Sequence, residues 1–219
     1  MATFTLTRMY FGGMYDHLGG GFHRYSVDAQ WLVPHFEKML YDNAQLAPVY
    51  LEAYQATSDP LFARAAREIF DYELRDMQDA NGAFYSTEDA DSEGQEGKFY
   101  IWTQDEINSI LGDADGYLFC QYYNMRPGGN FNSHEKYHAD QNILHVTRPA
   151  DTVAKEFSMS VEDFEKKLAE CRAKLLAVRD KRVRPGLDDK ILTSWNGLMI
   201  SALAQGYQVL GDARYRDAA

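Results

Sequence analysis

Cysteine is scarce in this chain of 219 residues, since only Cys120 and Cys171 are present. They lie far apart and form no C-x-x-C arrangement, which argues against a disulfide framework or a dithiol redox motif. We therefore expect a reducing, cytoplasmic location. Cys171 falls on an apolar stripe of helical spacing with Phe164, Leu168 and Leu175, which predicts a buried and unreactive thiol.

Long apolar runs and positive charge are also lacking. No run approaches the roughly 20 residues that a membrane-spanning helix needs, and the start MATFTLTRMY lacks the charged-then-apolar build of a signal peptide. The 22 Lys and Arg residues face 33 Asp and Glu residues, for a net charge of −11. Because this balance repels nucleic-acid backbones and anionic lipid surfaces, we expect a soluble protein with neither partner.

The residues that are present can fill a core, because 45% are hydrophobic and 14% aromatic. Most of the periodic signal is helical. The strongest apolar stripe spans residues 61–77 and follows Asp59-Pro60, an N-cap and a proline suited to the first turn. A second helix covers residues 46–54, and the short link between the two predicts an antiparallel helical hairpin.

Further helices are predicted from their ends. Capping boxes begin at Thr103 and Ser160, and a last helix runs from about residue 194 to 210, before a glycine. Strand signals are confined to short pieces such as residues 98–102 and 143–146. The sequence therefore predicts one mainly helical domain, with short β pieces in its loops.

Polar or glycine-rich loops separate the predicted helices, and loops of such length in a compact helical domain usually carry function. They cover residues 12–27, 79–98, 124–142 and 182–190. The first positions already have the residue pattern of a helix, and another helix is predicted to begin at residues 215–219. Both ends of the domain therefore look cut.

Four segments carry a resemblance to a known family: GGMYDHLGGGFHRYSVDAQWLVPHFEKMLYDNAQL, GAFYSTEDADSEGQEGKFYIWT, DQNILHV and DDKILTSWNGLMISALA. In this order they resemble the spermatogenesis-associated, thioredoxin-domain-containing protein family, and with the helices between them they cover nearly the whole chain. The resemblance implies a partial (α/α) toroid of helical hairpins over residues 1–219, similar to six-hairpin glycosidases and N-acylglucosamine 2-epimerases. The activity of the family as a whole is not settled.

The chain departs from the family pattern in three ways. The thioredoxin-like domain and its cysteines are absent, final hairpins of the toroid are missing, and Asp140 stands where a glycine is common. The first departure removes any redox expectation, and we expect no cofactor. The second predicts an open ring whose apolar faces are covered by a second copy or by the remainder of a longer chain.

The densest group of chemically capable residues follows three consecutive glycines. Sugar sites combine an aromatic platform with charged groups that bind hydroxyls, and acid/base chemistry needs a carboxylate or histidine in reach. If residues 35–41 open a helix, His35, Lys38 and Asp42 share one face. The alternative is a helix cap with solvated charges. The group comprises His23, Arg24, Tyr25, Trp31, His35, Glu37, Lys38, Tyr41 and Asp42.

The acidic run that begins at Glu88 and Asp89 has three interpretations. Paired carboxylates serve glycoside chemistry, in which one protonates the leaving oxygen and the other activates water or attacks. Asp89 and Asp91 also imitate the first ligands of a calcium loop, yet Tyr100 stands where a bidentate glutamate is required. The third interpretation is a solvated acidic loop.

Residues 134–138, HEKYH, match the H-E-x-x-H pattern of zinc peptidases, which requires a helix that places both histidines on one face. Loop-forming residues flank the match on both sides, so we predict no metal site there. The last candidate segment holds Asp188 and Asp189 just ahead of a helix that begins near Trp195. It offers acid/base groups beside a stacking surface, and the alternative is ordinary capping of that helix.

Two function classes follow from these segments. In the first, the chain is a carbohydrate-active enzyme of the isomerase, epimerase or hydrolase type that acts on a small, sugar-like molecule. In the second, it is a non-catalytic binding or scaffold module that partners a thioredoxin-like domain. Candidate acid/base residues are His23, His35, Asp42, Glu88, Asp89, Asp188 and Asp189. Candidate binding residues are Arg24, Tyr25, Trp31, Glu37, Lys38, Tyr41, Asp91, Trp102, Lys190, Trp195 and Asn196.

Overall fold

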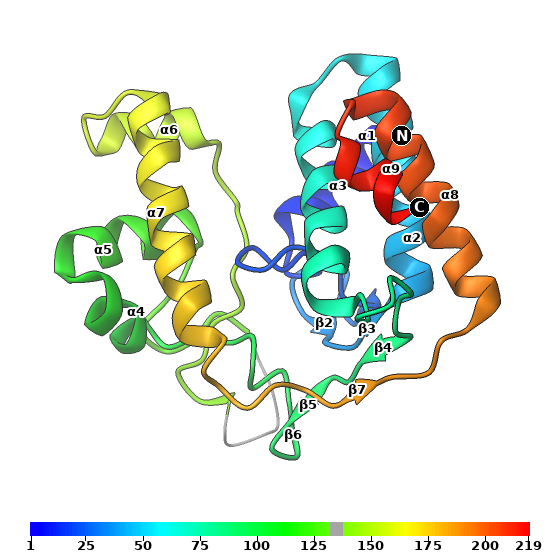
Figure 1. The fold of residues 1–219 in the computed structure, drawn as a ribbon. Helices are drawn as coiled ribbons and strands as arrows, with labels where there is room; N and C mark the ends of the chain where they lie inside the picture. The colour runs from blue at the N-terminus through cyan, green and yellow to red at the C-terminus, as the bar shows by residue number, and fades with distance from the viewer. Residues whose placement is uncertain (132–137) are drawn as a thin grey trace.

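The computed structural model describes residues 1–131 and 138–219 and is mainly helical, as predicted. Its helices gather into two groups, and short strands lie near one end of both (Figure 1). One group contains α1 (Ala2–Phe11), α2 (Leu40–Thr57), α3 (Pro60–Tyr72), the π-helical turn η1 (Glu73–Met77), α8 (Thr193–Leu210) and α9 (Ala213–Ala218). The other contains α4 (Gln104–Leu111), α5 (Asp113–Tyr122), α6 (Ala150–Glu156) and α7 (Val161–Arg179).

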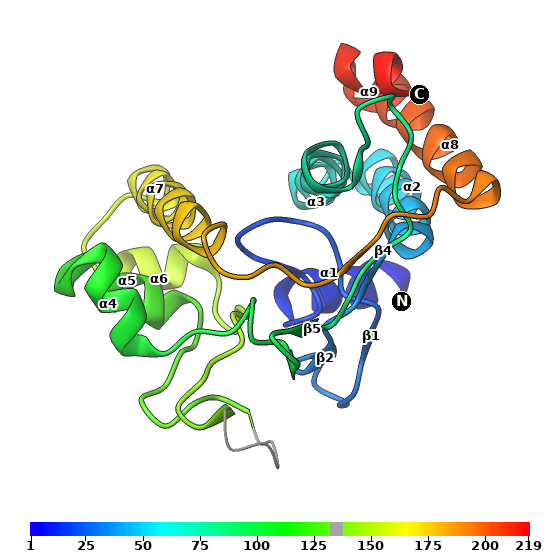
Figure 2. The ribbon, with the colours of Figure 1, turned by 60° about the horizontal axis from the view of Figure 1, so that its bottom comes forward.

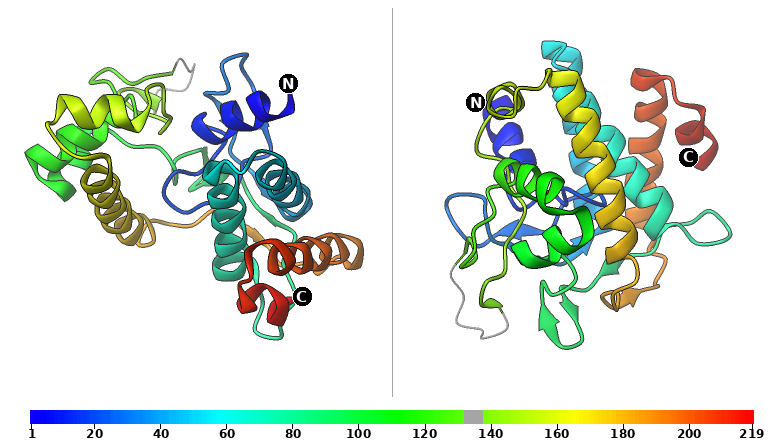
Figure 3. Two further views of the ribbon diagram at one scale, coloured as in Figure 1. Left: turned by 90° about the horizontal axis from the view of Figure 1, so that it is seen from above. Right: turned by 90° about the vertical axis from the view of Figure 1, so that its left-hand side faces the viewer.

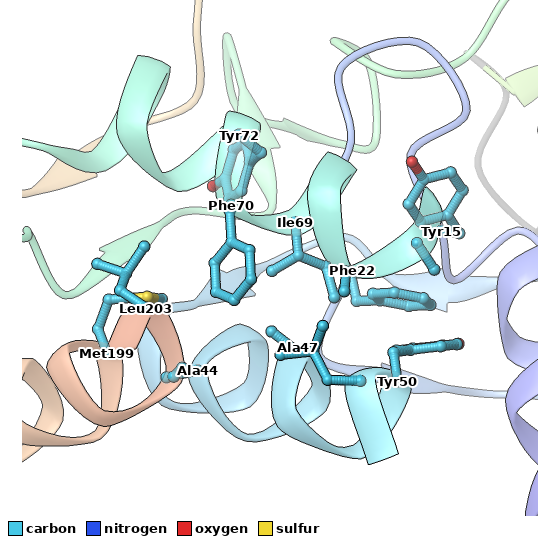
Figure 4. Close-up of a cluster of buried hydrophobic side chains, with 14 of the residues drawn as sticks. Tyr15, Phe22, Ala44, Ala47, Tyr50, Ile69, Phe70, Tyr72, Met199 and Leu203 are labelled. Carbon is cyan, nitrogen blue, oxygen red and sulfur yellow. The ribbon is translucent and has the colours of Figure 1, made fainter. Parts of the chain in front are cut away.

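The predicted hairpin is the antiparallel pair α2–α3, and α8 packs beside it. Their facing sides build the first core cluster, in which Tyr50, Phe70, Met199 and Leu203 are all fully buried (Figure 4). Gly206 on α8 lets the helix approach the ring of Phe70, because an added Cβ would lie 2.6 Å from that ring. The first core therefore joins the early hairpin to a helix from the end of the chain.

The second group has a core of its own around Trp102, Phe119 and the predicted stripe on α7. Phe164, Leu168, Cys171 and Leu175 are all buried there, which confirms the expectation for Cys171. Seen from above, the two groups lie apart and are connected through loops (Figure 3). No helix among the described residues is long and apolar enough to cross a membrane.

Most of the predicted helix ends are confirmed. Thr103 forms a full capping box with Glu106, and the Ser160 hydroxyl accepts a hydrogen bond from the Asp163 backbone. Asp59 caps α3, and Gly211 ends α8 in the left-handed region at a φ of 71°. Side-chain caps of this kind stabilise a helix by about 1 kcal/mol each.

The predicted strands at residues 98–102 and 143–146 are wrong. Residues 97–100 form turns, and the two segments meet only at a bridge between Trp102 and Asn142. Residues 35–39 are likewise extended rather than helical, because they pair with other strands and α2 begins only at Leu40. His35, Lys38 and Asp42 therefore do not share a helix face.

The observed strands are each two residues long. A hairpin pairs β1 (Tyr25–Ser26) with β2 (Pro34–His35), and another pairs β5 (Asp91–Ser92) with β6 (Gln95–Glu96). A three-stranded antiparallel sheet joins β3 (Lys38–Met39), β4 (Thr87–Glu88) and β7 (Leu187–Asp188) in that order. Figure 2 turns this end of the molecule forward.

Candidate functional site

The three-stranded sheet brings together the three segments that the sequence marked as candidates. Its register places Met39 opposite Thr87, and Thr87 opposite Asp188. Residues opposite one another in an antiparallel sheet point to the same face, and successive residues alternate between faces. Glu37 and Asp89, two positions from Met39 and Thr87, accordingly share this face with Asp188.

A groove of about 500 Å³ lies on this face of the sheet. Its wall holds three carboxylates, from Glu37, Asp89 and Asp188, together with the ammonium group of Lys190 and the ring of Trp195. We refer to it as the acidic groove. Its volume falls in the range of small-molecule sites, roughly 300–1,000 Å³.

At the β7 end of the groove, two side chains, Asp188 and Trp195, are held in place by neighbouring residues. Lys190 Nζ lies 2.6 Å from Asp188 Oδ2, and this contact lowers the pKa of Asp188. The carboxylate of Asp188 is therefore ionised at neutral pH. Trp195, in the first turn of α8, is half-buried and meets the ring of Tyr41 edge-on at 4.8 Å. Tyr41 thereby orients the one tryptophan that reaches the groove.

His35 stands beside the groove between two carboxylates. Its Nδ1 lies 2.7 Å from Glu96 Oε1 on β6, while its Nε2 lies 3.6 Å from Glu37 Oε2. An ionised carboxylate only accepts hydrogen bonds, so His35 donates from Nδ1 to Glu96 in this contact. Arg24 holds Glu37 from the other side at 2.8 Å, and Tyr25 stacks on the imidazole ring at 5.1 Å.

Asp42 lies in the first turn of α2, close to the charges of Arg24 and Glu37. Burial raises the pKa of its carboxyl group to about 6, and its Oδ2 atom is buried without a hydrogen-bond partner among the described residues. A carboxylic acid with such a pKa can donate or accept a proton near neutral pH.

The opposite face of the same sheet is closed to solvent at β3 and β4, whereas Leu187 on β7 is exposed. Lys38 and Glu88 pair in the register and are both buried. Lys38 Nζ lies 2.9 Å from Asp16 Oδ2, and Arg179 binds the same carboxylate in a bidentate manner at 2.7 and 2.9 Å. We call Asp16, Lys38 and Arg179 the buried triad. The two cations hold the pKa of Asp16 well below its usual range, against the cost of burial.

Glu88 and His23 belong to this interior rather than to the groove. The Tyr72 hydroxyl donates to Glu88 Oε2 at 2.8 Å, and Arg184 approaches Glu88 Oε1 at 3.6 Å. His23 Nδ1 lies 2.8 Å from the Phe36 carbonyl oxygen, and burial lowers the pKa of His23 to about 3. Lys38, Glu88 and His23 therefore present no surface to a ligand in the groove.

Four other candidate residues also lie outside the groove wall. Trp102 is fully buried beneath the Arg182 guanidinium, which sits 3.7 Å from its ring centroid. Asn196 exchanges two hydrogen bonds with the backbone of Phe84 and so anchors α8. Trp31 packs against the first core cluster, and Asp189 is exposed. The sequence supplied no means of separating these residues from the groove residues.

The acidic run forms the β5–β6 hairpin. Asp91 pairs with Glu96, and the two turn residues Glu93 and Gly94 have φ angles of 54° and 74°, as in a two-residue turn. This is not the geometry of a twelve-residue calcium loop. In the described part of the chain, no group of three or more His, Cys, Asp or Glu side chains is arranged to hold a metal ion. The HEKYH match extends into residues 132–137, outside the described residues.

Sequence reasoning missed Glu96, Asp16 and Arg179. Glu96 had a signal, because a two-residue turn at Glu93-Gly94 predicts a hairpin that pairs Glu96 with Asp91. Asp16 and Arg179 had none, since their contact joins positions 163 residues apart.

Comparison with known proteins finds relatives that match nearly the whole chain. Human spermatogenesis-associated protein 20 is 40% identical over 232 residues, which cover 98% of this chain and 30% of that protein. The chain is homologous to a segment of spermatogenesis-associated protein 20. The mouse protein is 39% identical over 229 residues, with coverage of 96% and 29%. An uncharacterised protein of Caenorhabditis elegans is 34% identical over 233 residues, with coverage of 98% and 32%.

The chain thus spans about three-tenths of the length of the human and mouse spermatogenesis-associated protein 20. No protein-family model matches it. Among solved structures, a D-mannose isomerase has a TM-score of 0.38 at 14% identity, covering 99% of this chain and 48% of the isomerase. A sugar epimerase from a ruminal bacterium has a TM-score of 0.32 at 13% identity, covering 94% and 63%.

Proposed function

We propose that the acidic groove binds a carbohydrate and that its carboxylates perform acid/base chemistry on it, as in sugar isomerases, epimerases or glycoside hydrolases. One observation carries the proposal: Glu37, Asp89 and Asp188, from three distant segments, line one groove together with Trp195. Carboxylates accept hydrogen bonds from sugar hydroxyls, and an indole ring packs against the apolar face of a pyranose.

The groove holds a base, and a weak acid lies near it. Asp188, held ionised by Lys190, supplies the base. Asp42 does not line the groove, but its charge is coupled to that of the lining residue Glu37, and with a pKa of about 6 it remains partly protonated near neutral pH. The imidazole of His35 lies beside Glu37 at the edge of the groove. Such a set suits proton transfer at a sugar carbon or at a glycosidic oxygen.

We propose further that residues 1–219 form one domain and part of an (α/α) toroid. The hairpin α2–α3 and the packing of α8 against it support this arrangement. Leu198, Ile200 and Tyr207 on α8 are exposed apolar residues, which further helices or a second copy would cover.

A thermal-shift experiment on the intact chain tests the function. D-mannose, D-glucose, N-acetyl-D-glucosamine and cellobiose are added separately, and a bound sugar raises the melting temperature by mass action. Asp89→Asn and Trp195→Ala should each abolish the shift. Asp151→Asn, an exposed carboxylate that pairs with Lys155 on α6, is the matched control and should retain it. Absence of any shift across the four sugars would reject carbohydrate binding.

A second step separates an enzyme from a binding module. Proton NMR of the sugar that gives a shift detects a new epimer, a ketose or a hydrolysis product over hours. A sugar that binds and stays unchanged favours the alternative, a non-catalytic module that presents a ligand to a thioredoxin-like domain.

A further inference from the structure

A second cavity, of about 420 Å³, lies between the two helical groups and is separate from the acidic groove. Its wall uses α1, the first turn of α3, the end of α5, residues 146–150 and the N-terminal half of α7. In Figure 1 these parts of α3 and α7 lie toward the ends of the helices that are farther from the strands. The cavity and the groove share no lining residue.

The charge of this cavity wall contrasts with that of the protein. Four guanidinium groups line it, from Arg8, Arg64, Arg148 and Arg172, against two carboxylates, those of Asp59 and Glu165. The whole chain has a net charge of −11. An excess of cations is therefore concentrated at this one cavity of an acidic protein.

Two of the arginines form no ion pair among the described residues, although the charge of Glu68 acts on Arg172 from a longer distance. Within the described residues, no carboxylate lies within 4.0 Å of Arg8 or Arg172 in an ion pair. Arg8 instead approaches a backbone oxygen of Gln30 at 3.4 Å, and Arg172 binds the hydroxyl of Tyr123. Arg64 has only a long contact of 3.7 Å with Glu165, and Asp59 is occupied in capping α3.

Much of the remaining wall is apolar, and Thr7, His17 and Thr147 add polar groups to it. Phe11, Leu61, Tyr122 and Val146 contribute carbon surface between the arginines. A cavity that is mostly apolar and holds a few convergent polar groups is the usual form of a small-molecule site. Guanidinium groups recognise carboxylate and phosphate oxygens through paired hydrogen bonds.

We propose that this cavity is a second ligand site, which binds a small organic anion with an apolar body and a phosphate or carboxylate head. The body contacts Phe11 and Tyr122, and the head binds the unpaired guanidinium groups of Arg8 and Arg172. Because the cavity joins both helical groups, the ligand also ties the two groups together.

Isothermal titration of the full chain with three probes tests this proposal. Phenyl phosphate has both the ring and the anion, inorganic phosphate has only the anion, and benzylamine has the ring with the opposite charge. Phenyl phosphate should bind about tenfold more tightly than inorganic phosphate, since it also buries its ring. Benzylamine should not bind. Equal binding of phenyl phosphate and benzylamine, or no saturable binding of phenyl phosphate, would overturn the proposal.

Substitutions locate the binding. Arg8→Gln should weaken phenyl phosphate binding about tenfold, because hydrogen bonds to charged groups are strong. Arg8 is exposed and makes one long contact, so this variant should fold; Arg172→Gln tests the more buried partner. Arg216→Gln on α9, which pairs with Asp217, is the matched control and should bind as wild type. An unchanged affinity in Arg8→Gln and Arg172→Gln, or a loss in Arg216→Gln, would place the anion elsewhere and reject this site.

The Asp89→Asn variant distinguishes the carbohydrate site from the anion site experimentally. It should abolish the thermal response to sugars and leave phenyl phosphate binding unchanged. Failure of the carbohydrate proposal therefore leaves the anion proposal standing, and the reverse also holds.

Discussion

Both faces of the small sheet β3-β4-β7 carry charged residues, but these residues have different roles on the two faces. On one face, Asp89 and Asp188 point into a groove and are open to a ligand. On the other, Lys38 and Glu88 are buried, and their charges are balanced by neighbours. The strand alternation separates Glu88 from Asp89, although they are adjacent in the sequence. The role of each acidic residue in the run thus depends on the face of the sheet on which it lies.

The largest expected effect comes from breaking the buried triad. Asp16→Asn removes the carboxylate that binds both Lys38 and Arg179, so two buried cations lose their ion-pair partner. We expect a loss of about 3–5 kcal/mol in the free energy of unfolding. Urea denaturation followed by circular dichroism measures it. A loss well below 1 kcal/mol would mean that the triad contributes little to the closed face.

Glu88→Gln and Asp89→Asn compare the two faces directly. Glu88→Gln keeps an acceptor for the Tyr72 hydroxyl but loses the attraction of Arg184, so it should lower stability by about 1 kcal/mol. Asp89→Asn should leave the unfolding midpoint near that of wild type and remove the response to sugars. The same two assays, denaturation and thermal shift, are run on both variants. If the two variants exchange these phenotypes, the assignment of faces is wrong.

The free energy of unfolding should depend on pH through the ionisation of Asp42. Its folded pKa, about 6, lies above the ordinary value, so the folded state holds this proton more tightly than the unfolded state. The resulting stabilisation is complete below the ordinary pKa near 4 and is lost as the pH rises through about 6. Denaturation at a series of pH values from 4 to 8 (roughly the interval that brackets both pKa values) measures the loss. Asp42→Asn should remove this contribution, and an unaltered pH profile in the variant would contradict it.

The smallest expected effect is a change of tautomer at the groove rim. Glu96 fixes the proton of His35 on Nδ1, so the ¹⁵N chemical shifts of the imidazole should report Nδ1–H in wild type. Glu96→Gln should shift the population toward the Nε2–H form, with little change in stability. The readout does not require activity. An imidazole without a proton on Nδ1 in wild type would contradict the hydrogen bond to Glu96.

Helix ends and apolar stripes were predictable because their signals are local. The caps at Thr103 and Ser160 need only a hydroxyl and an acidic residue three positions later, and the α7 stripe follows from helical spacing. The strands were not predictable in this way. Each is two residues long, which is too short to show a period, and Lys38 and Met39 pair with residues 87–88, which are distant in the sequence.

The sequence predicted which segments form the candidate site better than it predicted which residues line the groove. The groove takes residues from all three marked segments, among them Asp89, Asp188 and Trp195. Lys38 was predicted to bind a ligand, but it is buried against Asp16, and lysine is seldom buried without such a partner. Asp16 lies on a loop with no signal of its own. Burial of a charged side chain depends on such long-range partners, which spacing along the chain does not reveal.

The same long-range pairing orders the events of folding. The Ser86 hydroxyl bonds to the Asp188 backbone over 102 positions, and Arg179 binds Asp16 over 163 positions. Contacts between distant parts of a chain form late, since closing a long loop costs more entropy than closing a short one. On a ribosome, α2 and α3 can therefore pair while β7 is still unmade. A nascent chain that stops before Leu187 holds two strands of the sheet and has no groove.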